Sequence, residues 1–254
     1  MTATTMGGPS RAAASTRWFY VGMAGTFVLI AFGGFVPTYW AKIASGTFGG
    51  NPVLHVHGAL FFGWTLFFLA QTTLASRGRV LDHRAWGMAG ISLATAMGFT
   101  VVLAAINSIK VAETIGMGDE ARRFSIVSLS ALVAFAVLFT AAIVNNRRPE
   151  VHKRLMILAC IPLMQAAVAR LFQVAMTPPG VVGPPPVFVS LPPGLVVDLL
   201  IVAAMVYDWR TRGRPHPVYL WGGPAILAIQ ILCLPVSATP AWMAVARGVE
   251  SLAG

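Results

Sequence analysis

The sequence predicts an all-α polytopic membrane protein, a bundle of seven transmembrane helices with its N-terminus inside and its C-terminus outside. Of the 254 residues, 57% are hydrophobic and only 10% are charged, whereas soluble domains average about 45–50% and about 25%. The mean hydropathy is +0.75. The apolar residues form long runs with short basic segments between them, which is typical of helical membrane spans. This composition excludes a disordered chain and a soluble enzyme.

Seven apolar runs approach or exceed the roughly 20 residues that a transmembrane helix needs. The runs are continuous rather than alternating, which excludes a transmembrane β-barrel. The fifth run is interrupted by Arg170, and the sixth is short and contains Asp198. We expect the spans at residues 19–40, 53–75, 85–107, 124–144, 155–176, 193–207 and 218–236.

The seven spans are expected to form one domain at residues 18–240. Residues 1–17 are rich in Ala, Thr, Gly and Ser, which predicts a flexible segment. Residues 241–254 are expected to form a short interfacial tail. Between the fifth and sixth runs, repeated prolines predict an extended, stiff strap and an abrupt start of the sixth helix.

The basic residues predict the orientation. The net charge is +10, from 18 Lys and Arg against 8 Asp and Glu. Most of the basic residues lie before the first run or after the second, fourth and sixth runs, which places these segments in the cytoplasm. Arg122 and Arg123 on the outer side are an exception, partly offset by Asp119 and Glu120. Because the clusters form no continuous basic face, the expected partner is the lipid bilayer and not nucleic acid.

Three inner turns each carry a basic cluster and a histidine that opens the next helix: His83, His152 and His216. This suggests a repeated two-helix hairpin. Alternatively, the membrane orientation alone would place basic residues in the inner turns, without any repeat. Two such imidazoles could ligate a haem iron and three could hold a divalent metal, with Asp82 and Glu150 as hydrogen-bond acceptors behind them. Alternatively, the histidines anchor helices at the headgroups, with Asp82 as an N-cap, or form a proton site.

A second polar layer is expected near the outer ends of the spans. Arg170 and Asp198 are the two charged residues that interrupt spans, and ionisable groups inside a membrane are functional candidates. At 1.5 Å per residue they lie about 9 Å and about 7.5 Å deep, so we expect them to pair. The other polar residues of this layer are His55, His57, Asn107 and Gln173.

This outer layer could line an outward-open cavity, in which a histidine exchanges protons or holds a metal and Arg170 binds an anionic group. Alternatively, Arg170 and Asp198 only clamp two helices together. His55 and His57 are two residues apart and therefore point about 200° apart on a helix. We expect only one of them to face the bundle, and we do not expect them to share an ion.

Three motifs carry a resemblance to known families: His-Val-His-Gly-Ala-Leu-Phe-Phe-Gly-Trp at 55–64, Asp-His-Arg-Ala-Trp-Gly at 82–87 and Val-His-Lys-Arg-Leu-Met at 151–156. The chain resembles uncharacterised bacterial multi-pass membrane families, described as domains of unknown function. The resemblance implies a bacterial inner-membrane location, and some relatives by pattern are linked to respiratory oxidase assembly. The chain also bears a looser likeness to dihaem b-type cytochromes. It differs from their pattern in one respect, because only one helix here carries outer-side histidines.

Three functions remain open at this point. The first is haem or metal binding in respiratory electron transfer or oxidase assembly, with His57, His83 and His152 as ligands, haem b as the candidate cofactor and respiratory-chain proteins as partners. The second is a carrier or sensor for a small anionic or apolar ligand that acts through the outer layer. The third is a membrane scaffold without a site. No phosphate-binding loop or hydrolase motif is present, which speaks against a conventional kinase or hydrolase. Whether the protein is an enzyme of another class stays open.

Overall fold

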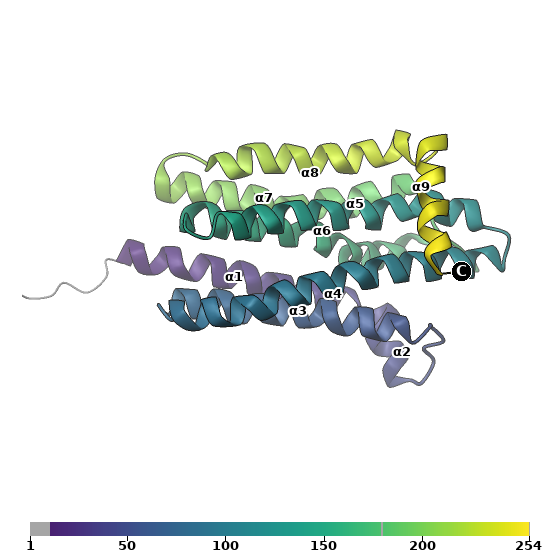
Figure 1. Ribbon diagram of the computed structural model, residues 1–254, viewed down its shortest axis with the longest axis horizontal. Helices are drawn as coiled ribbons and strands as arrows, with labels where there is room; N and C mark the ends of the chain where they lie inside the picture. Colours follow the sequence, from purple (N-terminus) through teal and green to yellow (C-terminus); the bar gives the residue numbers. More distant parts are fainter. Residues whose placement is uncertain (1–10, 179, 254) are drawn as a thin grey trace, which may run out of the picture.

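The computed structural model describes residues 11–178 and 180–253, and these form a bundle of helices (Figure 1). Seven helices in this described part are long and apolar enough to cross a membrane, which confirms the predicted all-helical, multi-pass architecture. The helices are α1 (Arg11–Gly34), α2 (Ala41–Ala44), α3 (Val53–Ser76), α4 (Val80–Glu113), α5 (Gly118–Val144), α6 (Pro149–Met176), α7 (Leu191–Arg212), α8 (Pro217–Val236) and α9 (Pro240–Glu250), with helical turns η1 (Val36–Trp40), η2 (Val187–Ser190) and η3 (Ser251–Ala253).

The turns between helices gather at two opposite ends of the bundle. The end that holds the three turns at residues 77–79, 145–148 and 213–216 is called the basic end, after the arginines of these turns. It lies on the left in Figure 1, together with the start of α1. The opposite end is called the α9 end, because α9 lies across it.

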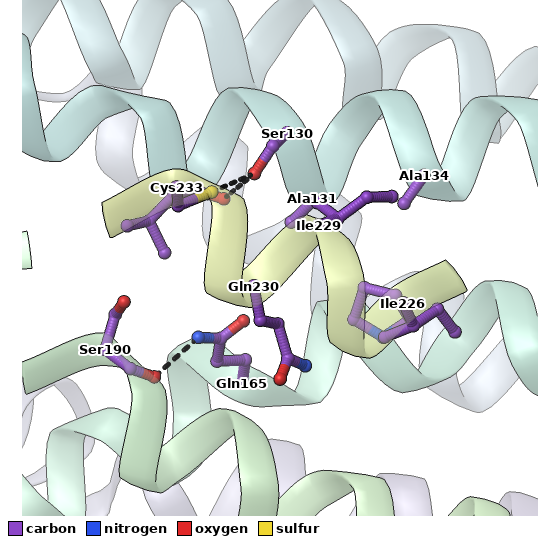
Figure 2. Close-up of a pocket in the computed structure, with 11 residues that line it drawn as sticks. Ser130, Ala131, Ala134, Gln165, Ser190, Ile226, Ile229, Gln230 and Cys233 are labelled. Carbon is purple, nitrogen blue, oxygen red and sulfur yellow. Dashed lines mark hydrogen bonds between the residues drawn. The ribbon is translucent and has the colours of Figure 1, made fainter. Parts of the chain in front are cut away.

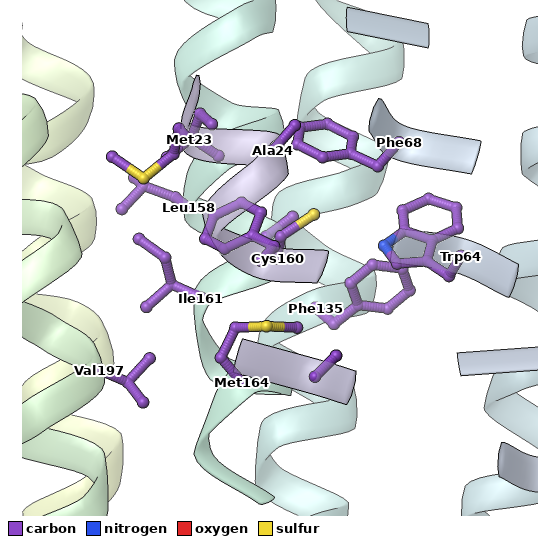
Figure 3. Close-up of a cluster of buried hydrophobic side chains, with 14 of the residues drawn as sticks. Met23, Ala24, Trp64, Phe68, Phe135, Leu158, Cys160, Ile161, Met164 and Val197 are labelled. Carbon is purple, nitrogen blue, oxygen red and sulfur yellow. The ribbon is translucent and has the colours of Figure 1, made fainter. Parts of the chain in front are cut away.

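Five helices form a closed ring, in which α1, α3, α4, α5 and α6 pack in sequence and α6 closes on α1. α7 and α8 pack against α6 outside this ring, and α8 also contacts α5. Helix α6 therefore has neighbours on all sides, and residues 157–162 are buried around its whole circumference. Its Cys160 and Met164 meet Trp64 and Phe135 in the core (Figure 3). The rings of Trp64 and Phe135 contact edge to face, with centroids 5.3 Å apart.

The helices approach closely where the sequence supplies glycine. A Cβ added at Gly34 would lie 2.4 Å from the backbone oxygen of Ala167, so α1 touches the backbone of α6 there. A Cβ at Gly222 of α8 would lie 2.4 Å from Cδ1 of Leu158 on α6. Small residues at such crossings let helices pack tightly in a membrane, where apolar burial alone gives little preference for protein over lipid.

Several elements differ from the predicted runs, because helices continue through flanking polar residues and one span is interrupted at a proline. α4 extends well beyond the predicted 85–107 at both ends, and α5, α6 and α7 also continue through polar residues beside their apolar runs. The first span contains η1, a π-helical turn at Pro37, where the missing N–H breaks the α-helical bonding pattern. Residues 1–10 of the predicted flexible segment 1–17 lie outside the described residues. The backbone of residues 11–17 is helical. α7 starts directly after η2 with prolines in its first turn.

The C-terminal helix α9 is fastened to the α9 end by Arg122 of α5. Trp242 Nε1 donates to the backbone oxygen of Arg122 at 2.9 Å, and Arg122 Nε donates to Glu250 Oε2 at 2.9 Å. Arg122 also pairs with Asp119 at 2.9 Å and with Glu113. Three carboxylates thus surround this guanidinium. They explain how Arg122 is accommodated at the α9 end, which carries fewer basic residues than the basic end.

We expect Gly34→Ala to lower the free energy of unfolding by about 1–3 kcal/mol, because the new methyl group overlaps the backbone of Ala167. Gly33→Ala is the matched control, since a Cβ there meets nothing within 4 Å; it should be neutral or stabilise by up to about 1 kcal/mol. Thermal unfolding in detergent measures both. Equal effects of the two variants would contradict the close approach.

We expect α9 to detach at low pH. The hydrogen bond from Arg122 lowers the pKa of Glu250, so this contact stabilises α9 above the ordinary glutamate pKa of about 4.3 and is lost as the pH falls through the lowered value. Hydrogen–deuterium exchange of α9, corrected for intrinsic rates, should rise in that window. Glu250→Gln should show the raised exchange at neutral pH, while Glu120→Gln should not. Exchange that depends on neither pH nor Glu250 would refute this fastening.

Candidate functional site

Two predicted site histidines meet at the basic end. The rings of His83 on α4 and His152 on α6 have centroids 6.2 Å apart and planes at 81°, and both are half-buried. Nδ1 of His83 lies 3.3 Å from the backbone oxygen of Gln71, and Nδ1 of His152 lies 2.8 Å from that of Ala142. A carbonyl oxygen only accepts, so Nδ1 carries the hydrogen in both rings. Nε2 is then the unprotonated nitrogen of each neutral imidazole.

The geometry of this histidine pair follows from two similar hairpins. In α3–α4 and in α5–α6, a histidine in the first turns of the second helix reaches back to a carbonyl near the end of the first. The carbonyl of Ala142 lies in the last turn of α5, where helical hydrogen bonding runs out, so it is a ready acceptor. The ring of five helices then brings α4 and α6 near one another at this end. The sequence predicted the common depth of the two histidines, but not their contact.

The third inner histidine has a different role. Nδ1 of His216 accepts from the backbone N–H of Val218 at 3.2 Å and caps α8. Burial, and then the guanidinium groups of Arg154 and Arg212, lower the pKa of His216, which favours the neutral ring that can accept this bond. Within the described residues no three His, Cys, Asp or Glu side chains gather to hold a metal. The predicted three-histidine site is therefore wrong, because α8 lies outside the ring of five helices.

Gln71 is a polar neighbour of the pair that the sequence did not single out. It is 7% exposed, and its Oε1 is buried without a hydrogen-bond partner in the described part of the chain. The predicted acceptors behind the histidines are engaged elsewhere, since Asp82 pairs with Arg79 at 2.7 Å and Glu150 pairs with Lys153 at 2.7 Å. Both predictions were wrong because a cation one turn away on the same helix captures each carboxylate.

A fully buried ion pair lies on the other side of α6. Arg154 and Asp208 of α7 are 1% and 0% exposed, and Nε of Arg154 donates to Oδ2 of Asp208 at 2.7 Å. A second bond joins Arg154 Nη2 to Oδ1, so the pair is bidentate. Arg154 Nη1 also donates to the backbone oxygen of Glu150 at 2.8 Å, and the backbone N–H of His216 donates to Asp208 Oδ2 at 3.2 Å. These bonds offset the cost of burying two charges.

Tyrosines from two further helices face this ion pair. Tyr20 of α1 and Tyr219 of α8 interact electrostatically with both Arg154 and Asp208. Both hydroxyls are buried and lack a hydrogen-bond partner among the described residues. Lys153 Nζ lies 4.8 Å from the centre of the Tyr20 ring. The cluster therefore joins α7 and α8 to the ring of five helices through α6.

The predicted outer ion pair does not form. No ion pair between Arg170 and Asp198 occurs in the described ranges. Arg170 Nη1 donates to Gln173 Oε1 at 3.1 Å, and its guanidinium lies 5.8 Å from the centre of the Phe35 ring of the first span. Asp198 Oδ1 accepts from Gln230 Nε2 of α8 at 3.2 Å. The two side chains lie at the expected end but face different helices, so the prediction was wrong.

The remaining residues of the outer layer form separate contacts. His55 Nδ1 hydrogen-bonds with the hydroxyl of Tyr39 at 2.8 Å, whereas His57 Nδ1 hydrogen-bonds with that of Thr100 at 3.3 Å. The two histidines thus contact different elements, η1 and α4, and both are half-buried rather than only one facing the bundle. His57 lies within electrostatic range of Arg170. Asn107 is half-buried in α4, and no hydrogen bond in the described part joins it to the others.

No protein-family model, curated protein or solved structure matches the chain. The function is therefore argued from the geometry of the site.

We expect Asp208→Asn to destabilise the protein by about 3–5 kcal/mol, because it leaves the buried Arg154 charge without its partner. Glu150→Gln removes another carboxylate that bonds Arg154, but its side chain is 49% exposed, so the loss should stay below about 1 kcal/mol. Unfolding in detergent measures both. An Asp208→Asn loss no larger than that of Glu150→Gln would contradict the importance of the buried pair.

Proposed function

We propose that the protein binds a transition-metal centre at the basic end through Nε2 of His83 and Nε2 of His152. The observation that supports this is the contact of two imidazoles whose Nδ1 atoms both face backbone carbonyls. Metal-bound histidines almost always donate their other ring N–H to a carbonyl, carboxylate or water, which fixes the tautomer and orients the ring. Both histidines here have that arrangement before any metal binds.

The separation of the rings is short enough for both imidazoles to hold one metal atom. With metal–nitrogen bonds of about 2.0–2.1 Å, two imidazoles placed opposite one another have ring centroids roughly 6 Å apart. The observed separation is 6.2 Å. His83 and His152 would hold the iron of a haem or a single ion such as copper that accepts imidazole, and either would supply a redox centre.

The setting that we propose is a bacterial inner membrane, with the basic end in the cytoplasm and the C-terminus outside. The positive-inside rule supports this orientation, and the three carboxylates around Arg122 weaken its main exception. The motifs at 55–64, 82–87 and 151–156 support the bacterial location. In that setting, the metal centre would serve respiratory electron transfer or oxidase assembly, with respiratory-chain proteins as partners.

A second candidate function is the binding of a small anionic ligand by Arg170. One observation favours it: among the described residues Arg170 has no carboxylate partner, and its side chain donates there to the neutral amide of Gln173. A guanidinium placed about 9 Å inside the end of a span and beside His57 could take an anionic group as its partner. A carrier or sensor would use this site and would have no chromophore.

We expect the protein purified from membranes to contain stoichiometric metal, measured by elemental analysis, and the reduced-minus-oxidised visible spectrum to identify its form. A Soret shift with a sharp α band indicates haem b. A metal without these bands indicates a single ion. His83→Ala and His152→Ala should each weaken metal affinity by more than about tenfold.

His216→Asn is the matched control, because it changes a histidine at the same end and asparagine still caps a helix. It should keep the metal. A flat spectrum without stoichiometric metal, before and after incubation with added metal, would refute this function. Binding of small anions, tested by thermal shift with Arg170→Ala as the control, would then become the leading candidate.

A further inference from the structure

A small cavity lined by both apolar and polar side chains lies between α5, α6, α8 and η2, apart from the histidine pair and the buried ion pair (Figure 2). Its volume is about 20 Å³, which is enough for one water molecule. The side chains of Ser130, Gln165, Ser190 and Gln230 line it, together with the thiol of Cys233. A cavity with only apolar walls stays empty, whereas a cavity with several polar partners holds a water molecule.

Two amides meet beside this cavity. Gln165 Nε2 donates to the backbone oxygen of Ser190 at 2.8 Å, and Gln230 Nε2 donates to Asp198 Oδ1 at 3.2 Å. Oε1 of Gln230 is buried without a hydrogen-bond partner in the described residues. A Cβ added at Gly194 would lie 2.9 Å from this oxygen and 3.2 Å from Gln165 Nε2. The missing side chain of Gly194 therefore leaves space for both amides.

Through Gln230, the cavity is connected to a carboxyl group inside an apolar helix. Asp198 follows Gly194 by one helical turn, so both lie on the same face of α7. Helix α1 contacts α7 through the stacked rings of Phe19 and Tyr207, and Tyr20 is its titratable residue beside this contact. The other elements packed against α7 are α6, α8 and η2, and η2 carries no titratable residue. Their titratable residues are Glu150, His152, Lys153, Arg154, Cys160 and Arg170 on α6, and Tyr219 and Cys233 on α8.

None of these groups forms a hydrogen bond or an ion pair with Asp198 within the described part of the chain, where Gln230 is its partner. An acidic side chain inside a span without a cation beside it is unfavourable as a lasting carboxylate. Such residues mark proton pathways in membrane proteins. The cavity beside Gln230 provides space within the membrane for a water molecule, which an isolated acid would not have beside it.

We propose that Asp198, Gln230 and one water molecule in the cavity form a proton-binding site in the interior of the membrane. Asp198 takes a proton from a hydronium ion, which leaves a neutral carboxylic acid and one water molecule, and the reverse step returns the proton. Gln230 holds the carboxyl group through Nε2 and the water through Oε1. The site uses none of the residues that hold the histidine pair, so it is independent of the proposed metal site.

Infrared difference spectroscopy of the full chain between acidic and basic buffers tests this site. A protonated carboxyl group gives a carbonyl band that is distinct from carboxylate bands and shifts on deuteration. We expect one component of this band to be lost completely in Asp198→Asn, which keeps the size of the side chain. A spectrum without a titrating band, or with a band that Asp198→Asn leaves unchanged, would overturn the proposal.

The role of Gln230 is tested by two further variants. In Gly194→Ala the new Cβ crowds Oε1 of Gln230, and in Gln230→Leu the amide is absent. Both should move the Asp198 band to higher frequency, because its carbonyl loses the hydrogen bond. Gly22→Ala is the control, since a Cβ there meets nothing within 4 Å. An Asp198 band at unchanged frequency in both variants would overturn the part assigned to Gln230 and the cavity.

Discussion

The bidentate ion pair of Arg154 with Asp208 is the interaction on which the arrangement of the basic end depends. Both charges are fully buried, and in that environment neither is tolerable without the other. The pair fixes α7 to α6, and the bond from the backbone of His216 to Asp208 fixes the start of α8 as well. The three helices that meet here are therefore joined by one carboxylate, and the ion pair of Arg212 with Glu150 adds a second contact between α7 and α6.

Helix α6 separates two polar clusters because of its own periodicity. His152 and Arg154 are two residues apart, so their side chains point about 200° apart. Arg154 faces α7 outside the ring of five helices, whereas His152 faces His83 inside it. The ion pair thus sets the rotation of α6, and that rotation turns His152 toward its partner. The proposed metal site and the proposed proton site at Asp198 both rely on this central helix being fixed.

The sequence was sufficient for the architecture, because hydropathy and length decide which segments cross a membrane. It was insufficient for the buried ion pair, and the reason is specific. Arg154 directly precedes the predicted run 155–176, and Asp208 directly follows the predicted run 193–207. The apolar runs place the charged residue beside each of them outside the predicted span, whereas α6 and α7 continue as helices through Arg154 and Asp208 and bury them against each other.

The failed pairing of Arg170 with Asp198 has a related cause. Depth along a span can be counted from the sequence, but the rotation of each helix and the choice of neighbour cannot. Arg170 turns toward Phe35, and Asp198 turns toward Gln230. The depth of His83 and His152 was equally predictable, and their contact was not, because it depends on the closure of five helices into a ring.

X-ray absorption spectroscopy at the edge of the bound metal tests the central claim most directly, since it reports the atoms around the metal. The account predicts two imidazole nitrogens at about 2.0–2.1 Å, with the outer-shell scattering of intact histidine rings, in the wild type and in His216→Asn. A metal bound without imidazole scattering, or through sulfur, would contradict the assignment of His83 and His152 as its ligands.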